Sequence, residues 1–203
     1  MTRGGRLACG LVLLVAGAAA AAVALIVARG VSARDEPTFV EAFVARLMRS
    51  LAIPRALRAR VNPVPANAEV LSGARAHFAD HCASCHGNDG KGETTMGRNM
   101  YPRAPDMTLP ETQQLSDGEL FAIIENGVRL TGMPAWGSPG PEDDAETWGL
   151  AHFIRHLPEL TPEELDEMKE LNPKTKKELE EVEAIRRFLG GEARPPEDGS
   201  HEH

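Results

Sequence analysis

The chain has 203 residues, with 22 Lys and Arg against 30 Asp and Glu, and a formal net charge of −8. The charge is uneven, because residues 1–67 hold nine basic and three acidic side chains whereas residues 68–203 hold 13 and 27. The acidic larger part argues against nucleic acid as a partner and favours a partner with a basic surface. Three cysteines are too few for a disulfide framework.

The first segment is predicted to be a membrane anchor. Residues 7–28 carry no charge, and at about 1.5 Å per residue they form a helix of roughly 33 Å, enough to cross a hydrocarbon core of about 30 Å. The basic residues 1–6 are expected to stay in the cytoplasm and to direct the rest outward. The alternative is a cleaved secretory signal, since the "VSA" at residues 31–33 resembles a cleavage site, but such signals have apolar cores of only roughly 7 to 15 residues. Cys9 is expected to be a small apolar residue of the helix.

Residues 29–67 are predicted to form an amphipathic helix followed by a basic linker. In "TFVEAFVARLMRSL" the apolar residues recur at spacings of one, three and four, which predicts a single apolar helical face. This helix either lies on the membrane surface, held by anionic lipid, or packs on the folded domain. Pro54 limits the helix, and the residues after it are expected to be extended.

Residues 68–157 are predicted to form one helical domain. A helix over residues 68–82 leads into a loop over residues 87–110 that is rich in Gly and Pro. Ser116 and Glu119 form a capping-box pattern for the next helix, and Gly127 is a natural stop. A last helix is expected over residues 145–158.

A change of composition follows Pro158. Thr161, Pro162 and Glu164 are the expected N-cap, N1 and N3 residues of a short helix. A second charged helix is expected over residues 174–189, so that residues 158–189 form a charged helical extension. Residues 190–203 are expected to be a disordered tail whose terminal histidines, His201 and His203, are solvated.

The run "CASCH" places Cys82 and Cys85 two residues apart, with His86 directly after them. In an exported chain this pattern indicates covalent haem, because two thiols can add to the vinyl groups while the histidine reaches the iron. A thioredoxin-like pair would need a βαβ context, and a zinc site would need another pair of ligands with suitable spacing. The sequence has neither.

The second axial ligand decides what the iron can do. Met133, in "TGMPAWG", is the predicted ligand because Gly132 and Pro134 fix a loop that can press a thioether onto a metal. The other downstream methionines are expected to serve packing: Met96, Met100 and Met107. Histidine with methionine saturates the iron and favours electron transfer, whereas an open site would permit ligand binding or peroxidase-like chemistry.

Together, the helix before "CASCH", the loop "GNDGKG", the helix "DGELFAIIENGVRLTGMPAW" and the closing helix resemble a class I c-type cytochrome over residues 68–157. The segment is similar to membrane-anchored monohaem cytochromes of bacterial respiratory chains and to cytochrome subunits of dehydrogenases and oxidases. The resemblance implies an all-α cytochrome c fold, a small helical bundle around one covalently bound haem c. It also implies that the second nitrogen of His86 donates to a proline carbonyl, for which Pro105 is the best match and Pro102 the rival.

Other residues of this segment receive weaker predictions. Gly90 and Gly92 are expected to let the backbone approach the haem, and Trp136 is expected either to cover the haem or to pack in the core. Arg98 and Tyr101 could bond a propionate, but solvated loop positions are the preferred interpretation. Four histidines are expected to be surface or packing residues rather than ligands: His77, His81, His152 and His156.

The sequence therefore predicts an electron-transfer module rather than an enzyme. It is expected to be anchored by one helix in the bacterial inner membrane, with the haem domain on the periplasmic side. It would act as a free carrier or as a subunit of a respiratory or dehydrogenase complex. A haem enzyme or gas sensor with a displaceable distal ligand is the alternative, and a purely structural role of the tail helices is a third hypothesis. The expected partners are redox proteins with a basic docking surface and the membrane, but not nucleic acid.

Overall fold

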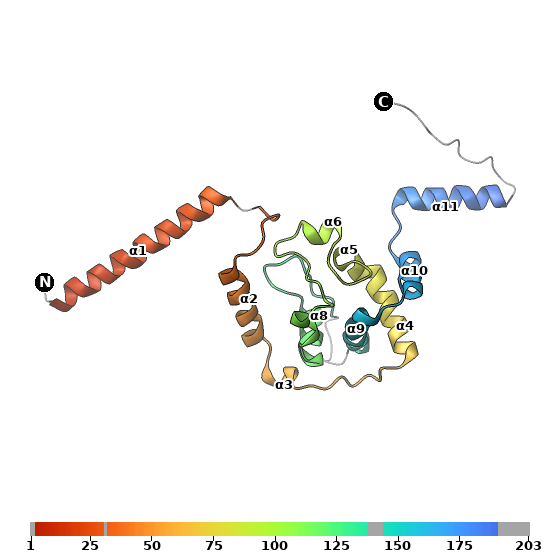
Figure 1. The fold of residues 1–203 in the computed structure, drawn as a ribbon, viewed down its shortest axis with the longest axis horizontal. Coiled ribbons are helices and arrows are strands. Elements are labelled where there is room, and N and C mark those ends of the chain that lie inside the picture. Colours follow the sequence, from red (N-terminus) through yellow and green to blue (C-terminus); the bar gives the residue numbers. More distant parts are fainter. Residues whose placement is uncertain (1–2, 31, 138–143, 191–203) are drawn as a thin grey trace, which may run out of the picture.

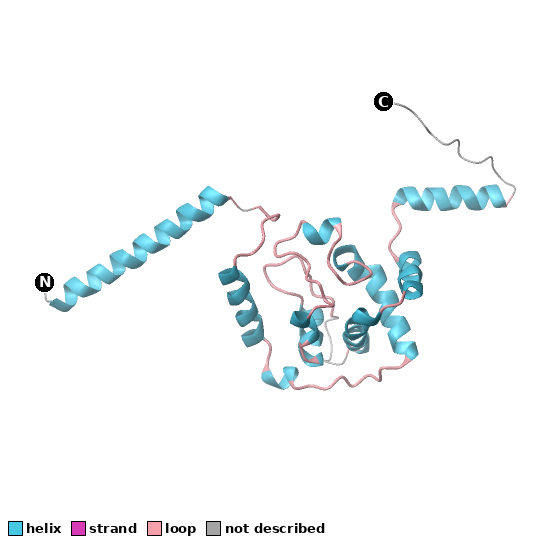
Figure 2. Cartoon of the chain, in the orientation of Figure 1, coloured by secondary structure: helices cyan, strands magenta, loops and turns pink. Residues whose placement is uncertain are grey.

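The computed structural model describes residues 3–30, 32–137 and 144–190. Within these residues the chain is helical and contains no strand (Figure 2), so the predicted all-α class is confirmed. Val31 of the possible cleavage site and residues 191–203, which include His201 and His203, lie outside the described residues. The helices are α1 (Arg3–Arg29), α2 (Phe39–Ala52), α3 (Arg55–Arg58), α4 (Ala68–His77), η1 (Phe78–Cys82), α5 (Ala83–His86), α6 (Thr95–Arg98), α7 (Pro110–Gln113), α8 (Asp117–Asn126), α9 (Ala145–His156), η2 (Leu157–Glu159), α10 (Pro162–Leu171) and α11 (Lys176–Leu189).

Helix α1 extends away from the rest of the chain (Figure 1). Its segment Cys9–Ala28 has a mean hydropathy of 2.8, none of it is buried, and it is long and apolar enough to cross a membrane. Cys9 is exposed on this apolar helix. The finding is compatible with the single membrane anchor predicted over residues 7–28.

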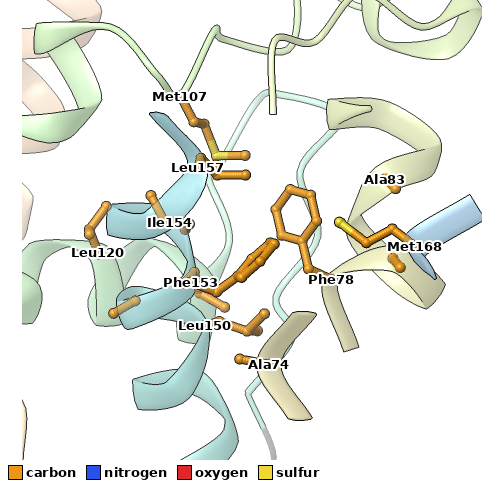
Figure 3. Close-up of a cluster of buried hydrophobic side chains, with 13 residues drawn as sticks. Ala74, Phe78, Ala83, Met107, Leu120, Leu150, Phe153, Ile154, Leu157 and Met168 are labelled. Carbon is orange, nitrogen blue, oxygen red and sulfur yellow. The ribbon is translucent and has the colours of Figure 1, made fainter. Parts of the chain in front are cut away.

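The hydrophobic core lies where α4 and η1 meet α8 and α9 (Figure 3). Phe78 and Phe153 are both buried, and their ring centroids are 5.1 Å apart. On the other side of α9, Trp148 stacks on Phe121 with a centroid distance of 4.2 Å. Burial of these large rings holds the three helices together, because aromatic side chains bury the most apolar surface per residue.

The segment 54–67, called the strap below, is bound to the domain along its length. The Ser116 hydroxyl donates to the Arg58 carbonyl oxygen at 2.8 Å, and the Asn62 amide donates to the Trp148 carbonyl oxygen at 2.8 Å. The sequence predicts an extended linker here, outside a domain that begins at residue 68. The structure differs because the short helix α3 packs against α8 and the polar groups of the strap find partners on the domain.

Helix α10 is likewise part of the core. Met168 is completely buried, and Arg75 of α4 forms an ion pair with Glu164 at 2.8 Å. Burial alone would raise the pKa of Glu164, but hydrogen bonds from the Thr161 backbone and His156, together with the positive charge of Arg75, lower it overall. The predicted extension over residues 158–189 therefore divides into a packed helix, α10, and an outer helix, α11, without buried residues.

Four helices begin with a capping box. The N-cap hydroxyl accepts from the N3 backbone amide while the N3 glutamate accepts from the N-cap backbone, which satisfies two backbone donors that a helix start otherwise leaves open. The predicted capping boxes of α8 and α10 are present, and Gly127 ends α8 with a φ of 63°. The same arrangement starts α2 and α11 at Thr38 and Thr175.

Candidate haem-binding site

The Cys-x-x-Cys-His run lies on a continuous helical path that changes pitch just before it. After α4 the backbone forms the π-helical turn η1, Phe78–Cys82, and then the α-helical turn α5, Ala83–His86. A π turn holds one more residue than an α turn and is frequent at functional sites. The Asn172 side chain donates to the Ala79 carbonyl oxygen at 2.8 Å, so α10 supports the widened turn.

Both thiols are free and partly buried. Burial raises the pKa of Cys82 to about 12, and the nearby Cys85 adds to the effect. The Cys85 sulfur lies 3.3 Å from the sulfur of Met96. A free thiol is the form of cysteine that can add to a vinyl group of haem, and both cysteines of the motif have this form.

His86 presents a neutral imidazole. Burial lowers its pKa, and the Pro105 carbonyl acts in the opposite direction more weakly. No well-formed hydrogen bond joins the two groups, and the Nδ1 atom of His86 is buried without a hydrogen-bond partner. Neutral imidazole is the form that binds a metal. The Nδ1 atom is therefore free to donate the predicted hydrogen bond to the Pro105 carbonyl oxygen.

The loop after His86 is held closely to the motif. The Gly92 amide donates to the His86 carbonyl oxygen at 2.7 Å, and Gly92 has a φ of 72°. A Cβ atom at this position would lie 2.3 Å from the Ala104 carbonyl oxygen, and one at Gly90 would collide with Leu157. Gly90 and Gly92 were expected to let the backbone approach the haem. The structure gives another reason for glycine at these positions, because the protein itself occupies the space that a side chain would need.

The loop that carries Met133 is tied to the end of α8. The Thr131 hydroxyl donates to the Val128 carbonyl oxygen at 2.7 Å and accepts from the Met133 amide at 3.1 Å. The Val128 amide donates to the Met133 carbonyl oxygen at 3.1 Å, and the Trp136 amide donates to Ile124 at 3.1 Å. These bonds fix the backbone on both sides of the methionine.

Cys82 and Met133 pack against the same apolar cluster, although they come from different elements. Members of that cluster include Phe78, Met107 and Leu157 (Figure 3). The donor set fits haem c. It consists of two free thiols, a partly buried imidazole whose Nδ1 atom has no hydrogen-bond partner, and a thioether, and two of its members, Cys82 and Met133, contact the same apolar cluster. In this arrangement Cys82 and Cys85 would hold the group, with His86 and Met133 as its axial ligands.

The remaining methionines occupy three different environments. Met107 is buried in the core, as its predicted packing role requires. Met96 is 56% exposed beside Cys85. Met100 lies next to the Met133 loop, because a side chain at Gly132 would collide with its sulfur atom. Met100 is thus the methionine to compare with Met133 in an experiment.

Within the described residues, the four histidines outside the motif have protein partners. His77 pairs with Glu146 at 3.4 Å, and the His81 ring lies tilted against the Trp136 ring with a centroid distance of 5.4 Å. His152 contacts the carbonyl oxygen of Val64 in the strap at 2.8 Å, and His156 contacts Glu164 at 3.0 Å.

Three other side chains of this segment also have protein neighbours. Trp136 is 39% exposed on the ring of His81, so it does not pack in the core. Arg98 pairs with Glu93 at 3.1 Å. Burial raises the pKa of Tyr101, and a hydrogen bond with Glu41 of α2 adds to the rise.

Two threonines were missed by the sequence analysis. Thr131 shapes the Met133 loop, and Thr94 donates to the Cys85 carbonyl oxygen at 3.0 Å while its hydroxyl accepts from the Gly97 amide at 2.8 Å. A threonine two residues before a methionine in a Gly-rich loop is a turn signal that could have identified the first. No local pattern connects Thr94 with Cys85.

The helical fold and this set of donors define a c-type cytochrome domain, a class of protein that transfers electrons through covalently bound haem. Residues 69–154 match the family model described as cytochrome c oxidase, cbb3-type, subunit III. The predicted resemblance to c-type cytochromes is thereby confirmed for this part of the chain. No curated protein matches the chain.

Proposed function

We propose that the protein is a membrane-anchored electron carrier, or the cytochrome subunit of a respiratory or dehydrogenase complex, with one haem c ligated by His86 and Met133. The observation that carries the proposal is the packing of Cys82 and Met133 against one apolar cluster. The sequence contains a single Cys-x-x-Cys-His motif, which supports a single haem.

The residues of the chain have separable tasks in this function. Haem c, when bound, supplies one-electron exchange between ferric and ferrous iron. Cys82 and Cys85 would hold the group covalently, and a hydrogen bond from His86 to the Pro105 carbonyl would orient the imidazole and increase its basicity. The Thr131 hydrogen bonds hold Met133 in place, and the surrounding apolar side chains exclude water. A site closed in this way makes no bond to a substrate, so the protein itself is not an enzyme.

The proposed location is the bacterial inner membrane, with α1 as a single-pass anchor and the cytochrome domain on the periplasmic side. In such an oxidising compartment a pair of thiols needs a use, and covalent attachment of haem provides one. An anchor keeps the carrier at a high effective concentration near membrane-bound partners.

The test is Met133→Ala in the full-length holoprotein, with Met100→Ala as the matched control. The oxidised protein should lose the weak long-wavelength absorption band of methionine bound to ferric iron, and the reduced protein should bind carbon monoxide rapidly. Axial ligands set haem potentials over about 0.8 V, so the midpoint potential should fall by a sizeable part of that range.

Covalent haem content serves as the folding control for both variants. Loss of the band in Met100→Ala instead of Met133→Ala would show that Met100 is the ligand. If the unmodified protein lacks the band and binds carbon monoxide rapidly, the haem enzyme or gas sensor is the better hypothesis.

A further inference from the structure

Helix α2 carries an apolar face that nothing in the described part of the chain covers. None of its residues is buried, and its apolar side chains are between 46% and 78% exposed. They are Phe39, Val40, Phe43, Val44, Leu47, Met48 and Leu51. Packing of α2 on the domain through this face would bury these side chains, and the structure shows no such burial.

The polar side of α2 contacts the cytochrome domain instead. Glu41 interacts with Tyr101 of the loop after α6. Arg49 is only partly exposed and interacts electrostatically with the carboxylate of Glu119 in α8. An Arg58 guanidinium nitrogen donates to the Ser50 carbonyl oxygen near the end of the helix. The apolar face is therefore turned away from the domain.

The position of α2 is fixed by the strap and by contacts before the helix. Arg58 in the strap pairs with Glu119 at 3.1 Å, and Arg60 lies 5.1 Å from the ring of Trp148. Ahead of α2, Arg103 of the domain pairs with Glu36 at 3.2 Å. The helix is thus attached to the domain on both sides, and its free face has a defined direction.

Three observations identify what covers this face. Only residues 30–38 separate α2 from α1, which is long and apolar enough to span a bilayer (Figure 1). Residues 39–60 contain five arginines and one acidic residue, and Arg46 and Arg55 are exposed. An amphipathic helix with arginines beside its apolar face, next to a membrane span, suits a bilayer surface with anionic headgroups.

We infer that α2 lies in the bilayer interface, with its apolar face among the lipid chains and its polar face against the cytochrome domain. This inference rests on the proposed membrane anchoring. Because α2 is attached to the domain, the helix holds the domain close to the membrane in one orientation. In that orientation α10 and α11, which lie on the side opposite α2 in Figure 1, face away from the bilayer.

The experiment places one spin label at a time on the full-length holoprotein in vesicles of phosphatidylcholine with phosphatidylglycerol. Cys9 is replaced by serine, and a single cysteine is introduced as Leu47→Cys on the apolar face, Ala45→Cys on the opposite face, or Val15→Cys in α1. Collisions with dioxygen, which dissolves in hydrocarbon, are compared with collisions with a water-soluble nickel chelate. Covalent haem content and the visible spectrum show that each variant is folded.

The inference expects Leu47→Cys to behave like Val15→Cys, with a dioxygen-to-nickel collision ratio several-fold higher than that of Ala45→Cys. Equal ratios at positions 47 and 45, with position 15 in lipid, would overturn the interfacial helix while leaving the anchor intact. A water-exposed label at position 15 would overturn the anchor and the inference together. Spectral broadening at position 47 that disappears on dilution with unlabelled protein would identify a second copy as the occupant and overturn the bilayer assignment.

Discussion

Gly92 holds its loop against the attachment motif through a backbone hydrogen bond to the His86 carbonyl oxygen. Its positive φ is costly for any other residue, by roughly 1–2 kcal/mol, and a Cβ atom would meet the Ala104 carbonyl oxygen. Gly92→Ala should therefore lower the free energy of unfolding by more than that amount and reduce the yield of holoprotein. Denaturant unfolding followed by circular dichroism measures the effect.

Gly73 provides the matched control for this substitution. It is exposed in α4, and a Cβ atom there would contact nothing within 4 Å. Gly73→Ala should stabilise the protein by about 0.5–1 kcal/mol, because alanine has the higher helix propensity. Equal effects of the two substitutions would show that the loop is looser than its contacts indicate.

At single positions, the sequence could predict residues whose chemistry is local. The spacing of Cys82, Cys85 and His86 predicts the attachment motif, and Gly132 and Pro134 single out Met133 among several methionines. The partner of a side chain is harder to predict when it depends on chain segments that meet only after folding. The contact of Thr94 with Cys85, and that of Met100 with the Met133 loop, belong to this kind.

Among the elements, α10 lies beyond the predicted domain end at residue 157 but packs against the domain core. Its charged sequence resembles that of a solvated helix, yet Met168 is completely buried against the core. Met168→Ala should lower the free energy of unfolding by about 2–5 kcal/mol, because it leaves a cavity in a packed core. Thermal unfolding of the full-length holoprotein measures it.

Leu171→Ala is the control on the same helix, since Leu171 is 44% exposed. Its effect should stay below about 1 kcal/mol, as is usual for exposed positions. If Met168→Ala were equally mild, α10 would be an appendage, as the sequence suggested. The helix boundaries themselves were predictable, because capping boxes and terminal glycines act within a few residues.

Helix α2 marks the limit of prediction from the sequence pattern. The spacing of apolar residues in α2 predicts a helix with one apolar face but does not say whether that face meets protein or lipid. The strap decides the question, because its contacts with Trp148 and Ser116 place the polar side of α2 against the domain. Those contacts join residues far apart in the sequence, so periodicity could not reveal them.

At the scale of the whole molecule, the N-terminal part is basic and the cytochrome domain is acidic. Residues 1–67 hold nine basic and three acidic side chains, whereas residues 68–157 hold six and 13. We expect the basic part to suit an anionic bilayer and the acidic part to attract basic proteins. Under this hypothesis, one chain would bind the membrane and a redox partner through opposite charges without competition between them.

This division predicts a salt-dependent reaction with a basic redox partner. Long-range attraction raises the association rate, and salt screens it with a Debye length of about 10 Å at 0.1 M. The electron-transfer rate constant, measured by stopped flow with the holoprotein, should fall several-fold as ionic strength rises.

Asp80 is exposed two residues before Cys82, so Asp80→Asn should weaken the dependence of the rate constant on salt if docking occurs near the motif. Glu181→Gln, on the outer helix α11, which has no buried residues, should leave it unchanged if docking occurs near the motif. A rate that does not change with salt would show that the acidic surface plays no part in docking.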